Sequence, residues 1–456
     1  METPARRWPA YNAVWRWHFY AGLFCIPFVL WLSVTGAFYL FKPQVEALID
    51  RPYAGLAMDG PSASAAAQAA AATRAVPGSV LHRYQLPVRA DDAVQIVVGG
   101  GGRETRVYVH PRSLAILKTV GENDRLMRIV SRLHGRLLMG DIGSYLVELA
   151  ASWAIVMIVS GLFLWWPRGG GAAGVLYPRL RSGGRRFWRD MHGVTGFWVS
   201  FFTLFLLLSG LPWAKSWGSY LQAVRTVAEG SASTPDWPTG SREEREARAA
   251  RDAATRAMLG DHAEHGGMAM AHAGATLLPL DRMVATLRPL GLASPVLVSP
   301  PARQGQPWTA KSDAANRPLR ADLTLDASGR LLTRRDFAQR RLMDRIVGYG
   351  VAAHEGQLFG WINQLLGLLT AIGLVLLSAS SVVLWWRRRP EDMLGAPVAL
   401  AGRPVSVGFI VLLVAFGVLL PLLGASMLLV LAVERWVLRR LPRARRWLGL
   451  RRVGAA

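Results

Sequence analysis

Five stretches of the chain are apolar over a length that suits a helix crossing a membrane. Four are continuous runs of about 20 residues, the length that spans a hydrocarbon core, at 19–41, 145–166, 194–213 and 362–386. The fifth, 405–437, is interrupted by Pro421 and Gly424. It predicts either one long kinked helix or a hairpin of two short helices. The first run has no cleavage site of small residues after it, which indicates a permanent span rather than a signal peptide.

Two long polar segments separate the apolar runs. Residues 42–140 contain an alanine-rich helical stretch at 62–76, followed by the strand-like sequences "VLHRYQLPV", "AVQIVVGG" and "TRVYVHP". Residues 214–355 contain a helical stretch at 280–290 and strands that end in "ADLTLDASGRLLTRRDF". In both segments, alternating apolar and polar positions between turn residues predict antiparallel strands after a helix. We therefore expect two soluble α+β domains.

Charge sets the expected orientation. The net charge is +23, but the arginines cluster in short segments beside the spans rather than along one surface. By the positive-inside rule, the N-terminus, the loop between the second and third spans and the end of the fourth are cytoplasmic. Both polar segments then lie outside. This distribution favours a membrane protein and argues against a nucleic acid partner.

The chain therefore divides into nine predicted parts. They are the N-terminus with span 1 (1–41), outer domain 1 (42–140), span 2 (141–167), a basic cytoplasmic loop (168–190), span 3 (191–213), outer domain 2 (214–355), span 4 (356–389), the C-terminal span or hairpin (404–438) and a basic tail (439–456).

Repeated spacings indicate an internal duplication. His18 and His192 are each followed by a glycine 4 residues on and another 18 residues on. His134 in "HGRLLMG" and His354 in "HEGQLFG" are each followed by a glycine 6 residues on, and each precedes a Trp-Trp pair by 31 residues. Both halves run span, domain, span from the same side, so they predict parallel repeats about an axis along the membrane normal.

The four repeated histidines predict two layers of ligands. His18 and His192 lie at the cytoplasmic ends of their spans, whereas His134 and His354 lie at the outer ends. Imidazole is the usual axial ligand of haem iron, and two layers would hold one haem near each membrane face. Two histidines are too few for a tetrahedral zinc site.

The glycines of the spans have two interpretations. They could leave room for a flat porphyrin, or they could allow close packing of helices. The glycines concerned are Gly22, Gly36, Gly196 and Gly210.

Other chemistry-bearing residues carry weaker signals. A loop at 261–272 holds soft metal ligands, which could capture copper or another metal or could reflect low-complexity drift. Its residues are His262, His265, Met268, Met270 and His272. The one cysteine, Cys25, excludes a disulfide framework, and "VVGGGGRET" has no surrounding βαβ unit, so it is not a nucleotide fingerprint.

These features resemble the PepSY-associated transmembrane proteins. The resemblance covers about residues 12–435 and is carried by "WHFYAGLF", "LHGRLLMGDIGSYLVEL", "MHGVTGFW" and "HEGQLFGWINQLLGLL". It implies that the outer domains are PepSY-like, a helix packed on an antiparallel sheet. Some members are inner-membrane reductases that carry two b-type haems and release iron from ferric siderophores. The family histidines correspond to His18, His134, His192 and His354, and the His/Met loop departs from the pattern.

The sequence thus predicts a mixed membrane protein: four core spans in two parallel repeats, a C-terminal span or hairpin, and two periplasmic α+β domains. We expect a bacterial inner-membrane oxidoreductase with two haem b groups that reduces a ferric siderophore or other ferric chelate. Its electron donor would be separate, a quinol or a cytoplasmic reductant. Two alternatives are a non-redox siderophore or metal uptake protein and a PepSY-type regulator of a periplasmic partner. The catalytic residues are not assigned.

Overall fold

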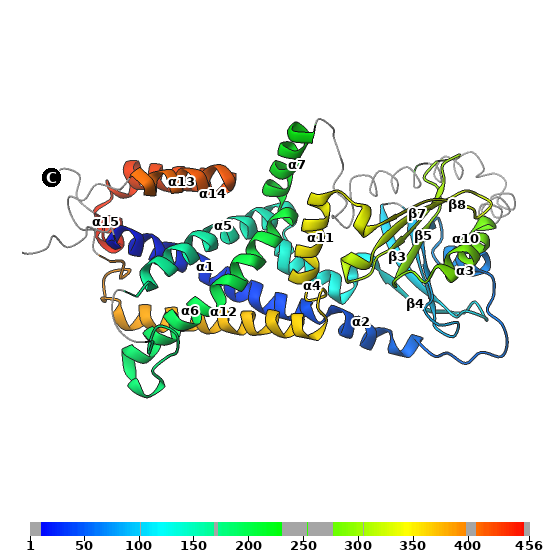
Figure 1. The fold of residues 1–456 in the computed structure, drawn as a ribbon, viewed down its shortest axis with the longest axis horizontal. Coiled ribbons are helices and arrows are strands. Elements are labelled where there is room, and N and C mark those ends of the chain that lie inside the picture. The colour runs from blue at the N-terminus through cyan, green and yellow to red at the C-terminus, as the bar shows by residue number, and fades with distance from the viewer. Residues whose placement is uncertain are drawn as a thin grey trace, which may run out of the picture. The chain divides into compact units, whose positions relative to one another are not determined.

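The computed structural model describes residues 11–100, 102–167, 172–229, 253, 277–303, 305–397 and 407–450. The chain forms two compact units (Figure 1). A helical unit comprises Met1–Leu40, Ser131–Gly230 and Gln364–Ala456, and a sheet unit comprises Phe41–Val130 and Ser231–Asn363. Each unit is described by itself below.

Five helices of the described chain are long and apolar enough to cross a membrane, so the protein is a multi-pass membrane protein. Their bounds are Tyr11–Leu40, Gly140–Trp165, Gly184–Trp213, Trp361–Arg388 and Pro421–Leu438. The helical unit also has the shorter apolar helix Ile410–Leu419.

The helices are assigned as follows. They are α1 (Tyr11–Leu40), α4 (Leu126–Arg136), α5 (Gly140–Trp165), α6 (Gly184–Gly210), α7 (Lys215–Glu229), α12 (Trp361–Arg388), α13 (Val407–Leu419), α14 (Pro421–Val433) and α15 (Pro442–Leu448).

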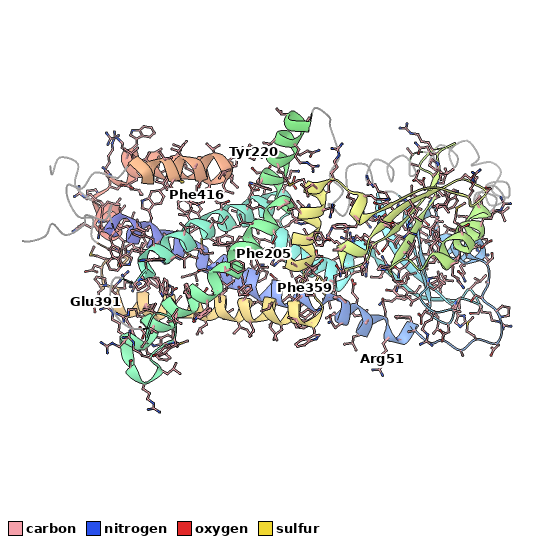
Figure 2. The ribbon with its side chains drawn as sticks, in the orientation of Figure 1. Arg51, Phe205, Tyr220, Phe359, Glu391 and Phe416 are labelled. Carbon is pink, nitrogen blue, oxygen red and sulfur yellow. The ribbon has the colours of Figure 1, made fainter. Side chains whose placement is uncertain are left out.

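The C-terminal apolar region is a helical hairpin. Leu420 leaves the helical conformation between α13 and α14 (φ −125°, ψ 80°). The two helices then lie side by side (Figure 1), and a Cβ on Gly424 would be 2.7 Å from the carbonyl oxygen of Gly417. Only glycine allows this approach. Phe416, labelled in Figure 2, packs with neighbouring apolar side chains of α5, α6 and α14.

The sheet unit holds one antiparallel sheet of eight strands in the order β4-β3-β2-β1-β5-β6-β7-β8. The strands are β1 (Val80–Leu86), β2 (Val94–Gly100), β3 (Arg103–Val109), β4 (Ile116–Gly121), β5 (Val296–Ser299), β6 (Trp308–Ser312), β7 (Ala321–Leu325) and β8 (Leu331–Asp336). The helices of this unit are α2 (Lys42–Asp50), α3 (Ala65–Ala75), α10 (Pro279–Leu287) and α11 (Leu342–His354).

This sheet differs from the expected pair of separate domains. Each polar segment does supply a helix followed by four strands, but β1 and β5 pair directly, with Tyr84 opposite Val298 and Leu86 opposite Val296. The pairing removes two exposed sheet edges. It also places α3 and α10 on the same face, over one apolar core (Figure 1). Alanines such as Ala69 and Ala72 on α3 are fully buried there and let the helix approach the sheet closely.

The opposite face of the first four strands carries a buried ionic network. Arg106 donates to Glu122 over 2.5 Å and to the side-chain oxygens of Gln85 and Gln95. Burial alone would raise the pKa of Glu122, but the adjacent Arg106 guanidinium outweighs it. The pKa of this carboxyl group therefore lies below its ordinary value of 4.5.

Candidate functional site

His18 of α1 and His192 of α6 lie next to each other in the helical unit. Their ring centroids are 6.4 Å apart and the ring planes cross at 84°. We call this pair the first histidine layer. It joins two residues that are 174 positions apart in the sequence, and the two helices that carry them begin the two apparent repeats.

The hydrogen bonds of His18 define its tautomer. Nδ1 lies 3.0 Å from the carbonyl oxygen of Met157 and 3.1 Å from Oγ of Ser160. A carbonyl oxygen can only accept, and the Ser160 hydroxyl already donates to the same carbonyl at 2.9 Å. The proton of the ring is therefore on Nδ1, and Nε2 carries the lone pair.

The same arrangement recurs at His192. Its Nδ1 lies 3.1 Å from Oγ of Ser381 and 3.4 Å from Oγ of Ser380. Both hydroxyl groups donate to the carbonyl oxygen of Leu377, at 2.8 and 2.9 Å. If both hydroxyl protons stay within α12, His192 Nδ1–H is the donor to the serines. A metal would bind both rings of the layer through Nε2.

His134, in the last turn of α4, has a comparable neighbour on α1. Its Nδ1 lies 3.1 Å from Oγ1 of Thr35, and that hydroxyl donates to the carbonyl oxygen of Trp31 at 2.8 Å. His354 is the last residue of α11 and belongs to the sheet unit. The pairing of His134 with His354 stays a prediction.

The turn after His134 has an unfavourable backbone. Leu137 and Leu138 have φ of 50° and 57°, the left-handed region that side chains other than glycine rarely adopt. Such residues cost roughly 1–2 kcal/mol each. They persist where surrounding structure holds them, often beside functional residues.

Three of the four predicted clearance glycines have a protein atom close to the position that a Cβ would take. A Cβ on Gly36 would lie 3.1 Å from Cε1 of His134, so this glycine admits an imidazole ring. Cβ atoms on Gly22 and Gly196 would meet Met157 Sδ at 3.8 Å and Leu377 Cδ1 at 3.2 Å. Gly210 is the last residue of α6. Their role beside a porphyrin stays a prediction.

A further glycine and the hydroxyl groups around the histidines were not predicted from the sequence. A Cβ on Gly161 of α5 would lie 3.0 Å from Cε1 of His18. The only available signal was the presence of small residues on the span that precedes the Trp-Trp pair.

A buried carboxylate was also missed. Glu148 of α5 is 2% exposed and accepts hydrogen bonds from the backbone N–H groups of Ser216 and Trp217, at 2.9 and 3.1 Å. These are among the first residues of α7, whose N–H groups have no partners within the helix. Glu148 therefore fixes α7 to α5, which is a structural role.

The remaining predicted ligands receive no support. The His/Met cluster (His262, His265, Met268, Met270 and His272) lies outside the described residues. Within the part of the chain that is described, no group of three or more His, Cys, Asp or Glu side chains could hold a metal ion. Cys25 is buried in α1.

The fold and this site define a multi-pass helical membrane protein with an antiparallel sheet unit and a pair of neighbouring histidines within its helices. The chain matches the model of the PepSY-associated TM region over residues 15–388, and it belongs to that family. The resemblance inferred from its motifs is thereby confirmed. No curated protein matches the chain.

Proposed function

We propose that this protein is a transmembrane electron-transfer protein in which His18 and His192 would hold one haem b. The observation that carries the proposal is the 6.4 Å between the ring centroids. A metal–nitrogen bond of about 2 Å, with about 1.1 Å from nitrogen to ring centre, puts two imidazoles across one metal ion with centroids about 6 Å apart.

The tautomers support the same assignment. Histidine ligands of metals usually donate their second N–H to a carbonyl, carboxylate or similar acceptor, which orients the ring and raises its basicity. Ser160 with Met157, and Ser380 with Ser381, offer such acceptors to the two Nδ1–H groups. When bound, haem supplies a one-electron redox couple; the chain's residues orient the two rings and keep a proton on each Nδ1.

Basic residues gather at the end of the helical unit nearest His18. Arg16 donates to the carbonyl oxygens of Pro397 and Gly449, and Arg388 lies over the ring of Trp15 at 5.1 Å. The start of α1, the end of α12 and α15 thus share one end of the unit. This grouping supports a cytoplasmic N-terminus, with the sheet unit on the periplasmic side of a bacterial inner membrane.

In this proposal, a separate quinol or cytoplasmic reductant delivers the electrons, and His134 and His354 stay predicted haem ligands. The terminal acceptor is a ferric siderophore or other ferric chelate, because reduction weakens the hold of hard oxygen ligands on iron. The protein would therefore be an oxidoreductase of the ferric reductase type.

The test is an optical spectrum of detergent-purified protein, expressed with ample haem, before and after dithionite. We expect b-type bands. His18→Ala and His192→Ala should each remove the same haem, whereas His110→Ala, in a turn of the sheet unit, should remove none. The crossed ring planes further predict the highly anisotropic low-spin EPR signal of perpendicular imidazoles. Colourless wild-type protein, or full haem content in both alanine variants, would refute the assignment.

A further inference from the structure

Trp165, the last residue of α5, has a buried indole N–H without a hydrogen-bond partner in the described chain. A buried indole N–H group usually has a hydrogen-bond acceptor, and burying this donor without a hydrogen bond is unfavourable. The atom is therefore a candidate donor to something that the protein binds.

The position of Trp165 links it to the first histidine layer. Its ring stacks on Phe197 with centroids 4.3 Å apart and planes 11° apart. Its Cδ1 would lie 3.4 Å from a Cβ on Gly193, the neighbour of His192 in sequence. One turn earlier on α5, Gly161 lies against the ring of His18. The indole is thus packed on α6 beside His192, and its own helix α5 contacts the ring of His18 one turn earlier.

The second Trp-Trp pair gives an internal comparison. Trp385 stands at the matching place before the end of α12, and its Nε1 donates to the carbonyl oxygen of Leu394 at 2.8 Å. Among the described residues, this indole has an acceptor and that of Trp165 has none. Trp166, beside Trp165, is 61% exposed, as expected for a residue at a membrane interface.

We propose that the Trp165 Nε1–H donates a hydrogen bond to a carboxylate on the edge of the cofactor held by His18 and His192. This inference rests on the proposed function, and it names the part of the ligand that the site recognises: an acidic side group of a porphyrin. An ionised acceptor gives a stronger hydrogen bond than a neutral one, which suits a donor in an apolar setting.

The experiment compares Trp165→Phe with the matched control Trp166→Phe. Each protein is loaded with haem, or with haem dimethyl ester, and the transfer of the cofactor to excess apomyoglobin is timed. A hydrogen bond to a charged group corresponds to about tenfold or more in dissociation rate. We expect haem to dissociate faster by that factor from Trp165→Phe and at nearly the wild-type rate from Trp166→Phe. With the dimethyl ester, the dissociation rates of wild type and Trp165→Phe should differ much less.

Ultraviolet resonance Raman of the wild-type indole N–H provides a second measurement that does not depend on the variant folding. A new hydrogen-bonded tryptophan signal on haem binding, absent with the ester, supports the proposal. Haem-loaded Trp165→Phe that releases haem at the wild-type rate overturns it and leaves the proposed function intact. An effect of equal size with the ester overturns it as well. Wild-type protein that binds no haem refutes the proposed function itself.

Discussion

The serines beside His192 should tune the reduction potential of the site. In the double variant Ser380→Ala with Ser381→Ala, Nδ1 of His192 loses the two hydroxyl oxygens that lie 3.4 and 3.1 Å away. When the hydrogen bond from its Nδ1–H group is weaker, an imidazole is less basic and donates less electron density to a metal. The ferric form is then stabilised less, so the potential should rise.

The size of the effect follows from the strength of one hydrogen bond. A typical bond contributes about 0.5–1.5 kcal/mol net, and a tenfold change in a one-electron equilibrium is about 59 mV. Since about 1.4 kcal/mol is tenfold, the shift should be about 20–60 mV upward. Ser160→Ala should shift the potential by less, because it removes one hydroxyl oxygen beside a histidine where the double variant removes two.

The assay is a spectroelectrochemical titration of the purified haem protein, with Thr203→Ala as the control. The Thr203 hydroxyl also donates within its own helix, to the carbonyl oxygen of Val199 at 2.8 Å, so it tests the loss of a hydroxyl as such. The reasoning is wrong if the double serine variant leaves the potential unchanged or lowers it. It is also wrong if Ser160→Ala has the larger effect.

Three further predictions concern packing, the sheet and pH. Gly161→Ala places a Cβ 3.0 Å from the His18 ring, so we expect overpacking to lower the stability by roughly 1–3 kcal/mol and to alter the haem spectrum. The control Gly22→Ala should stay near wild type, because the atom nearest to its Cβ is 3.8 Å away. Cysteines at the paired positions Leu86 and Val296, in a Cys25→Ala background, should form a disulfide on mild oxidation, because the Cα atoms of antiparallel partners lie within the distance that a disulfide spans. Moving the second cysteine two residues along β5 should abolish the disulfide. Equal disulfide yields at the two positions would contradict the single sheet. Because the folded pKa of Glu122 lies below its ordinary 4.5, the ion pair stabilises the sheet above that pH and is lost as pH falls through the folded pKa. The protection factors of the β3 and β4 amides, which correct for the intrinsic exchange rate at each pH, should therefore fall with acid in the wild type, and that fall should be weaker in Glu122→Gln.

The spans could be predicted from sequence because burial in lipid needs only length and apolar composition. The approach of His18 to His192 could be anticipated as well, since the equal spacings in the two halves imply equivalent helices. The hydroxyl neighbours could not. Whether Ser160 or another small residue of α5 faces His18 depends on the rotation and depth of two packed helices, and neither follows from a run that is apolar on all sides.

The single sheet was beyond sequence reasoning for a different reason. Each group of four strands has its own turns and alternation, so each predicts a complete meander by itself. The pairing of β1 with β5 joins strands more than 200 residues apart, and strand patterns do not state which edge meets which. The buried alanines of α3 and the apolar residues of α10 were visible, but that the two helices share one core was not.

Serine and threonine hydroxyls explain how the apolar helices of this protein can hold ordered imidazoles. Thr35, Ser160 and Ser381 each donate to a carbonyl oxygen of their own helix and lie within 3.1 Å of a histidine Nδ1 on another. A hydroxyl used in this way offers an acceptor without adding an unsatisfied donor, and such a donor would be costly away from water. At His18, where a carbonyl oxygen is a second acceptor, this arrangement places the ring proton on Nδ1. In the proposed haem site, this tautomer would leave Nε2 of His18 available to the iron, and the small polar residues of these spans would orient the rings.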